Sequence, residues 1–534
     1  MINSKELLIS ALNDFNSGEL LKSKDKCHQL LKNNAQNFDA IHLLGVIEYK
    51  NKRLDESISL LSNAIKLQPQ NTQARFNLAK TLREAKKFHE AIKNYKIVCI
   101  VLKDDPQPFI EIGLSFSRSH QYTNAILAFE KAIELGSNNP DLLCELGVAQ
   151  TLSGYLKKAK NTFTKLLKKN KNHIFSLINL AIVFEHYGDF DEAILIYDKL
   201  ITDNKNPYEA SKRKSLALLA KGDLKNGWLN YGFRYLWPNN KTLHNKIDKP
   251  FWKGESLEKN KILVWTEQGL GDEILFGTII NDLVTKNPNV KIACSSRLLK
   301  LFKKSFPHNE IINKDNEDIK PELIKDIRYQ GSLTEVAKIY RPNIKSFKSN
   351  GIYLKNDINK TNELKIKYLN GKKIPIIGLS WRSANISAEI QKSIPLIEWE
   401  KILTGIPAKL ISLQYGNPRK ELENFRNKTD INIYNDPNIN TEYELTDFVN
   451  QVAAMDLIIS ISNTTVHAAG ALGIPTWAII AKGTGRPWYW FAKEKKCLWY
   501  KSVKIYNQKN SGDWSHPSLM IKKDLKEWVA NWKK

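Results

Sequence analysis

Apolar and small residues repeat with a fixed spacing of 34 along the first two-fifths of the chain. Each period has one small residue, a second small residue twelve positions later, and a large side chain four positions further on. This spacing is typical of two helices that approach closely through small side chains, and we expect the larger side chain to fill the space between neighbouring pairs. The three sets are Gly45, Ala79, Gly113, Gly147 and Ala181; Ser57, Ala91, Ala125, Ala159 and Ala193; and Leu61, Tyr95, Phe129, Phe163 and Tyr197.

The repeat predicts a stack of helix–turn–helix units. Five units are in register over residues 38–207, a weaker one precedes them and ends near Asn37, and a degenerate one follows around 216–223. Each unit buries its apolar face only against its neighbours, which leaves an extended concave surface. We therefore predict a helical domain over 1–245 that docks a peptide or protein. A purely structural or oligomerisation role stays open.

Beyond the polar stretch 239–249 the pattern changes. Short apolar runs alternate with amphipathic, helix-like segments, which predicts parallel sheets covered by helices on both faces. A boundary near Gly371 divides this region into lobes over 246–370 and 371–534. Ligands of such sheets bind at the carboxyl ends of strands, so motifs that follow strands are the candidates for chemistry. The predicted strands are 262–265, 290–293, 374–381, 409–413, 457–461 and 475–480.

A glycine-containing loop follows the first predicted strand. Gly269 and Gly271 permit a tight turn and a close backbone approach, and Asp272 comes directly after them. Asp272 is a candidate general base that accepts a proton from an acceptor hydroxyl. It is equally a good helix cap, and the helix dipole would favour its charged form and so weaken it as a base.

A hydroxyl-rich turn follows the strand 457–461. Asn463, Thr464 and Thr465 lead into a helix of small residues, so backbone amides and hydroxyls there are placed to bind a diphosphate. His467, one turn inside that helix, is a candidate for hydrogen bonding to a phosphate. The alternative is that Asn463 or Thr464 caps the helix and His467 packs inside.

Two other strand ends carry candidate ligand contacts. Arg382 and Ser383 end the strand 374–381, and Arg382 is placed to clamp a phosphate and to stabilise a leaving diphosphate. Gln414 follows the strand 409–413, with Tyr415 next to it, and is placed to hydrogen-bond a nucleobase. Arg382 as an ordinary surface residue is the alternative.

Charge and cysteine content narrow the function classes. The net charge is +25, but it is spread evenly, with +11 on residues 1–250 and +14 on 251–534. No nucleic-acid-binding motif accompanies it, so we expect no nucleic-acid partner. The five cysteines form no Cys-x-x-Cys pair, and we expect no bound metal. No leader-like start and no long apolar run occur, which leads us to expect a cytoplasmic protein without a transmembrane segment.

The 34-residue period resembles the tetratricopeptide repeat. The second region resembles the catalytic part of bacterial tetratricopeptide-repeat glycosyltransferases, which are similar to the ADP-heptose:lipopolysaccharide heptosyltransferase family (glycosyltransferase family 9). Repeats followed by a two-lobed transferase are also the architecture of protein O-GlcNAc transferases. The matching segments are Gly227-Trp228 with Tyr231 and Arg234, 251–255, 267–272, Trp381-Arg382, 412–414, 467–473, Trp488-Tyr489 and 499–508.

This resemblance implies an α-solenoid followed by a GT-B fold of two Rossmann-like lobes, the first for the acceptor and the second for a nucleotide-diphosphate sugar. It implies a hexosyl- or heptosyltransferase that needs no cofactor or metal, with inversion at the anomeric carbon. Asp272 corresponds to the family's acidic residue, and Thr464, Thr465 and His467 correspond to its phosphate-binding turn. Heptosyltransferases often carry Asp-Thr at Ser462-Asn463, which argues against heptose as the donor sugar. The competing hypothesis is a catalytically inactive adaptor that binds protein partners.

Overall fold

The computed structural model describes residues 4–232, 247–315, 321–349, 351–383 and 391–532. Its backbone contacts group into two compact units, Met1–Leu180 and Ala181–Lys534. The first unit consists of helices alone. The second begins within a helix and adds two parallel sheets to the last helical pairs, so the end of the helical array belongs to the same compact unit as the sheets. The predicted boundaries at 245 and 370 stay predictions.

Antiparallel helical pairs follow one another from the first described residue to Tyr231, as the 34-residue repeat predicts. The weak pair before residue 38 and the degenerate pair after 207 are both present. Within the described residues, no helix has the length and apolar character needed to cross a membrane. The helices are α1 (Ser4–Asn16), α2 (Leu20–Asn33), α3 (Phe38–Lys50), α4 (Leu54–Leu67), α5 (Thr72–Glu84), α6 (Phe88–Val101), α7 (Pro106–Arg118), α8 (Tyr122–Glu134), α9 (Pro140–Leu152), α10 (Leu156–Lys169), α11 (Ile174–Tyr187), α12 (Phe190–Thr202), α13 (Pro207–Lys221) and α14 (Leu224–Tyr231).

Several pairs are held by a large side chain that lies on the small residue of the partner helix. A methyl group added to Gly113 would lie 2.5 Å from the ring of Phe129, and one added to Gly147 would lie 2.5 Å from the ring of Phe163. Both rings are fully buried. The predicted close approach is confirmed, but the predicted place of the large side chain is corrected. Phe129 and Phe163 lie on the glycine of their own helical pair, where the absence of a Cβ leaves room for the ring, and not only between neighbouring pairs.

A second periodic signal marks the start of the first helix in the five pairs from α3 to α12. The side chains of Asn37, Asn71, Asp105 and Asn139, spaced by 34, accept a hydrogen bond from a backbone amide two or three residues on. His173 occupies the next position of the series, and its Nδ1 accepts from the amide of Ser176 at 3.2 Å. Each side chain satisfies a helix-end amide that would otherwise lack a partner.

The first sheet has four parallel strands in the order β3-β2-β1-β4. Its register pairs Ile262 with Val290 and, on the other side, Val264 with Gly331. Helices α15 (Leu270–Lys286), α16 (Leu299–Ser305), α17 (Pro321–Ile324) and α18 (Leu333–Tyr340) belong to this part of the chain. The strands are β1 (Lys261–Trp265), β2 (Val290–Cys294), β3 (Ile311–Asn313) and β4 (Ile327–Ser332).

The second sheet has six parallel strands in the order β10-β9-β8-β5-β6-β7. Its central strands β5 and β8 are buried along their whole length, as expected for a parallel sheet covered on both faces. The strands are β5 (Ile376–Ser380), β6 (Lys409–Ser412), β7 (Ile433–Tyr434), β8 (Leu457–Ile461), β9 (Thr476–Ile480) and β10 (Val503–Asn507), and the helices are α19 (Ile358–Leu369), α21 (Glu400–Leu403), α22 (Arg419–Thr429), α23 (Thr446–Ala453), α24 (Thr464–Leu472) and α25 (Ser515–Ala530).

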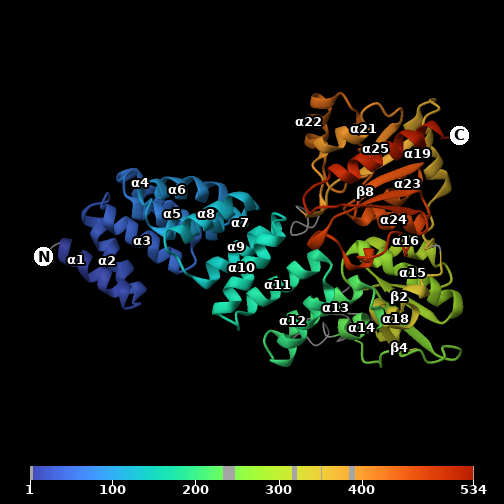
Figure 1. Ribbon diagram of the computed structural model, residues 1–534, viewed down its shortest axis with the longest axis horizontal. Helices are drawn as coiled ribbons and strands as arrows, with labels where there is room; N and C mark the ends of the chain where they lie inside the picture. The colour runs from blue at the N-terminus through green and yellow to red at the C-terminus, as the bar shows by residue number, and fades with distance from the viewer. Residues whose placement is uncertain (1–3, 233–246, 316–320, 350, 384–390, 533–534) are drawn as a thin grey trace. The chain divides into compact units, whose positions relative to one another are not determined.

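The two sheets share one hydrophobic core, and helix α15 of the first packs against helix α24 of the second (Figure 1). Tyr353 lies in this core, and its hydroxyl donates to the carbonyl of Ile274 at 2.7 Å. A methyl group added to Gly470 of α24 would lie 2.4 Å from the ring of Tyr500, so this helix is closely packed. The loops that begin α15 and α24 are thereby brought next to each other.

The packing of Gly147 on Phe163 leads to a test of the helical array. Gly147→Val is expected to lower the free energy of unfolding by about 1–3 kcal/mol, because the added side chain overpacks a filled space. Thr164→Val places the same side chain on the exposed face of α10 and should change stability by less than about 0.5 kcal/mol. Urea unfolding followed by circular dichroism at the helical band measures both, and equal effects would contradict this packing account.

Candidate functional site

The carboxyl ends of three neighbouring strands meet at one edge of the second sheet. Strands β8, β5 and β6 are adjacent in that order, and each runs directly into a loop that carries predicted site residues. Arg382 and Ser383 follow β5, Gln414 follows β6, and the turn 463–465 follows β8. The topology therefore brings together three motifs that lie up to 83 residues apart in the sequence.

Gln414 is buried and uses its amide to join two of these loops. Its Oε1 accepts from the backbone amides of Trp381 and Arg382, both at 3.0 Å, and its Nε2 donates to the carbonyl of Arg382 at 3.1 Å. Both halves of the amide are therefore engaged within the protein. In this structure Gln414 positions Arg382, whereas the sequence suggested that Gln414 forms a hydrogen bond with a nucleobase.

Asn463 links the third loop to the other two. Its Oδ1 accepts from the amide of Thr465 at 3.1 Å, which caps helix α24, and its Nδ2 donates to the hydroxyl of Ser380 at 2.7 Å. This is the capping arrangement that the sequence left open as an alternative. The amide of Ser383 is similarly held, by the hydroxyl of Ser393 at 3.0 Å.

A pocket of about 200 Å³ lies above these loops and is lined by both sheets' segments. Arg382, Thr464 and Thr465 all line it, so the structure brings together three of the residues that the sequence suggests for binding a diphosphate, and that role stays a prediction. The Nε of Arg382 donates to a carboxylate oxygen of Glu421 at 3.3 Å, which anchors the base of the guanidinium. The other lining residues are Leu270, Arg297, Tyr415, Thr441, Leu445, Phe448 and Asn463.

Arg297 is a pocket residue that sequence reasoning missed. It lies just after β2 of the first sheet, yet its Nη2 donates to the carbonyl of Thr441 at 2.6 Å and its guanidinium lies 5.7 Å from the ring centre of Tyr415. The Nε of Arg297 is buried without a hydrogen-bond partner in the described part of the chain. The signal was available, because Arg297 follows a predicted strand just as Arg382 does.

The glycine loop lies against the start of helix α24. A methyl group added to Gly271 would lie 3.3 Å from the imidazole of His467 and 3.4 Å from the hydroxyl of Thr464. The packing at Gly271 is therefore tight, and a larger side chain there would require its neighbours to shift. The positive φ of the loop, 67°, belongs to Gln268. The amide of Gly269 donates to a carboxylate oxygen of Asp272 at 3.3 Å, so Asp272 also helps to cap α15.

The pKa of Asp272 is raised to about 6 by burial, although the hydrogen bond from Gly269 and the charge of Lys392 both act to lower it. The expectation that the helix dipole would keep this carboxyl strongly acidic is therefore wrong, because loss of solvation outweighs it. A carboxylate with a pKa near 6 is a better base than an ordinary aspartate and is still mostly ionised at neutral pH. The same burial lowers the pKa of Lys392.

His467 is buried, with only 1% of its surface exposed. Its ring is stacked on that of Trp490, with centres 5.9 Å apart, and its Nε2 lies 3.3 Å from the hydroxyl of Tyr489. Burial lowers the pKa of His467 to about 3, so the ring is neutral. His467 thus supports the pocket as a packed, uncharged ring, and its Nδ1 has no partner among the described residues.

Comparison with known proteins bears on the helical part of the chain. Residues 42–100 match the tetratricopeptide repeat family. The chain contains tetratricopeptide repeats. Such repeats serve protein–protein interaction, and their stacked helical pairs account for the array that precedes the sheets.

Protein FlbA of Caulobacter vibrioides is 25% identical over 331 residues, which is 60% of this chain and 55% of that protein. The chain thus spans about half the length of this curated relative. A tetratricopeptide repeat protein from Parabacteroides merdae has 16% identity and a TM-score of 0.37, with 45% of this chain and 94% of that chain covered. YrrB, described as having an unusual peptide-binding site, has 15% identity and a TM-score of 0.31, with 34% and 92% covered.

The buried, neutral state of His467 makes the stability of the protein depend on pH. Below pH 6.5 the unfolded chain binds a proton at this residue that the folded chain refuses until about pH 3. As the pH is lowered below 6.5, this residue therefore reduces the free energy of unfolding of the wild type by up to about 1.4 kcal/mol per pH unit. His467→Phe should show a shallower fall of melting temperature between pH 6.5 and 4.5, with the exposed His308→Phe as control. If the melting temperatures of the wild type and of His467→Phe fall by the same amount over this pH range, the buried ring of His467 is not neutral.

Proposed function

We propose that this chain is a glycosyltransferase that moves a sugar from a nucleotide-diphosphate donor to a hydroxyl group of an acceptor. The observation that carries the proposal is the pocket lined by Arg297, Arg382 and Thr464, which adjoins the loop of Asp272. The two parallel sheets with a pocket where their segments meet are compatible with a GT-B fold.

The pocket has the chemistry that a diphosphate requires. Arg297 and Arg382 approach it from segments of different sheets, and Thr464 offers a hydroxyl at the start of a helix. Guanidinium groups form strong charge-assisted hydrogen bonds with phosphate oxygens, and a helix start favours negative charge. Tyr415 and Phe448 supply aromatic surface on which a nucleobase can pack.

The reaction follows from these positions. The carboxylate of Asp272 accepts the proton of the acceptor hydroxyl, and the oxygen of that hydroxyl forms a bond to the anomeric carbon of the donor sugar. The bond from that carbon to the diphosphate breaks, and its electron pair leaves with the diphosphate. The negative charge that develops there is stabilised by Arg297, Arg382 and Thr464. Attack opposite to the leaving group inverts the anomeric carbon.

The tetratricopeptide repeats support a protein, or a glycan carried by a protein, as the acceptor. The array buries its small and aromatic residues within each pair and leaves its exposed helical faces free for a partner. A docked acceptor raises the local concentration of its hydroxyl groups around the transferase region. If the pocket binds no nucleotide, the same array makes the chain an adaptor for protein partners, which is the alternative function.

Nucleotide binding by Arg382 is the direct test. In a thermal-shift panel of UDP-, GDP-, ADP- and CMP-sugars and the nucleotides that they release, at least one compound should raise the melting temperature. Arg382→Ala should weaken its binding about tenfold or more, because a charge-assisted hydrogen bond of about 1.5–3 kcal/mol is lost. Arg419→Ala removes the same charge from an exposed position outside the pocket and should bind normally. A panel without any stabilising compound would leave only the adaptor function.

Asp272 gives a second test, on the rate of transfer. Asp272→Asn should reduce kcat by about 10²–10⁴-fold, because the amide cannot accept the proton, while nucleotide binding is retained. The wild-type rate should fall as the pH drops below about 6, where Asp272 becomes protonated. Asp357 also caps a helix but lies outside the pocket, so Asp357→Asn is the control. Full activity of Asp272→Asn, or a rate that does not change between pH 7 and 5, would exclude Asp272 as the base.

A further inference from the structure

A second pocket, of about 320 Å³, lies at the other end of the same sheet edge. It is formed at the carboxyl ends of β9 and β10, which are neighbours in the six-stranded sheet. Its remaining wall is the end of α11 and the turn into α12, residues 185–190. All these segments belong to the second compact unit. None of the residues proposed for the nucleotide site lines it.

The wall between the helical turn and the sheet is closed by a glycine. Gly483 has a φ of +75°, and a methyl group added to it would lie 2.3 Å from the imidazole of His186. Only glycine accommodates both that backbone conformation and that contact. The residues of the segment after β9 are thereby held in place at the base of the pocket.

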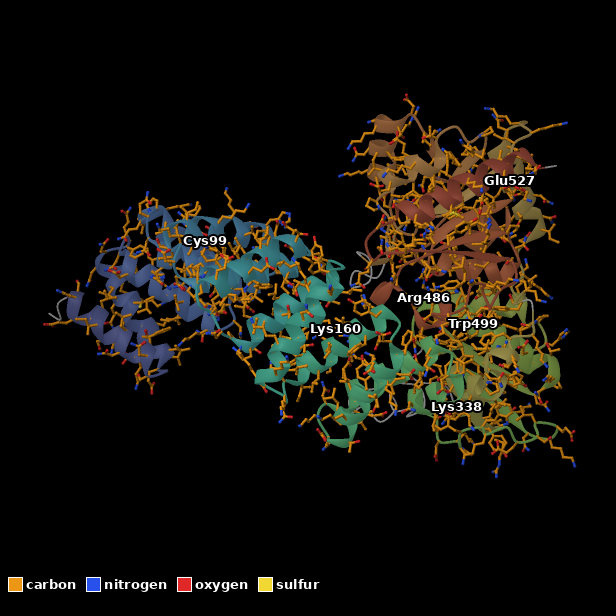
Figure 2. All side chains as sticks on the ribbon, viewed as in Figure 1. Cys99, Lys160, Lys338, Arg486, Trp499 and Glu527 are labelled. Atoms are coloured by element: carbon orange, nitrogen blue, oxygen red, sulfur yellow. The ribbon has the colours of Figure 1, made fainter. Side chains whose placement is uncertain are left out.

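Two buried groups in this pocket have donors that the protein leaves unused. Gln508 is 5% exposed, and its Oε1 accepts from the amide of Lys482 at 2.9 Å, while its Nε2 has no partner among the described residues. Arg486, labelled in Figure 2, donates through Nη1 to Asn507 and through Nη2 to two carbonyls, yet its buried Nε is also without a partner there. A buried donor without an acceptor is unfavourable, so a ligand that supplies an acceptor is favoured there.

The charges around the pocket match these donors. Lys482, Arg486 and Lys509 line it, and the pKa of Arg486, lowered by burial to about 10, leaves that group charged at neutral pH. The acidic residue of the lining is Glu185, whose pKa burial raises to about 7 and whose Oε1 accepts from the hydroxyl of Tyr197 at 2.6 Å. The pocket therefore has a surplus of donors and of positive charge, which is the complement of an oxyanion.

We propose that this pocket binds the oxyanion of a small ligand, a phosphate or a carboxylate. The Nε2 of Gln508 and the Nε of Arg486 donate to its oxygens, and Lys482 and Lys509 supply charge at the rim. Trp488, which also lines the pocket, offers a flat apolar surface for the body of the ligand. This binding needs neither the nucleotide pocket nor the transfer reaction, so it can be tested independently of the proposed function.

The test measures the binding of simple probes to the full chain by calorimetry. Inorganic phosphate and glucuronate are the two probes, and methyl glucoside is the neutral control. Every protein sample carries the Arg382→Ala substitution, which weakens any binding at the nucleotide pocket. One or both anions should bind at millimolar concentration or better, and the neutral sugar should not. The stronger of the two anions then distinguishes a phosphate ligand from an acidic sugar.

Two substitutions place the binding in this pocket. Lys509→Glu reverses a charge at its exposed rim and should weaken the anion about fivefold or more, while Lys501→Glu makes the same change at an exposed position outside it and should not. Gln508→Glu keeps the acceptor for the amide of Lys482 but replaces the donor by a negative charge, and should weaken binding more than tenfold.

The proposal is overturned if neither anion binds, if methyl glucoside binds equally well, or if Lys509→Glu and Lys501→Glu behave alike. If Gln508→Glu fails to fold, the rim pair alone decides, because both of its residues are exposed. Anion binding together with no response to any nucleotide would support this pocket while refuting the transferase.

Discussion

The close contact between Gly271 and the start of helix α24 is the constraint on which the candidate site depends. A methyl group added to Gly271 would lie 3.3 Å from the imidazole of His467 and 3.4 Å from the hydroxyl of Thr464, so the loop of the first sheet packs tightly on the helix of the second. Leu270 of the same loop lines the pocket, so Asp272 lies close to it, and burial raises the pKa of the Asp272 carboxyl group. The loop thus determines the position of Asp272, and loss of solvation determines its basicity.

The other side of the site is held by amide side chains. Gln414 and Asn463 connect the ends of three strands through hydrogen bonds, and they leave Arg382 and Thr464 to face the pocket. Such support matters because a guanidinium group binds a phosphate well only when its orientation is fixed. The two amides and the two ligand-facing residues therefore form one unit, although sequence reasoning assigned all of them to ligand binding.

Much of this structure could be predicted from the sequence, and the failures have physical reasons. The helical pairs were predictable because Gly113 and Gly147 recur with their aromatic partners at a fixed spacing. Six strands were predictable because they are continuous apolar runs, as strands covered on both faces must be. Strands β3, β4, β7 and β10 were missed because all four are sheet edges, and β4 also carries polar residues such as Gln330.

In the site, too, local sequence signals indicated which residues to consider, but they did not show the contacts with distant segments. Strand ends drew attention to Arg382, Thr464 and Asp272, and the structure brings these residues near one another because parallel topology gathers such ends at one edge. The strand-end rule would also have found Arg297. It could not have shown that Arg297 reaches Tyr415 and Thr441, which lie more than a hundred residues away. The pKa of Asp272 was beyond prediction for a similar reason, since burial by distant segments determines it.

The lysines and the arginines of this protein differ in where they lie. Lysine accounts for most of the 81 basic residues, and in the helical array a lysine-rich helix such as α10 simply covers solvated surface. Arginine is scarce, yet Arg297, Arg382 and Arg486 each line a pocket, and each guanidinium donates at least one hydrogen bond to the protein. Arginine is the residue whose planar group recognises oxyanions by geometry as well as charge. The net charge of +25 is therefore a poor guide to the partners of this protein, whereas the positions of its few arginines point to oxyanion ligands at both ends of one sheet edge.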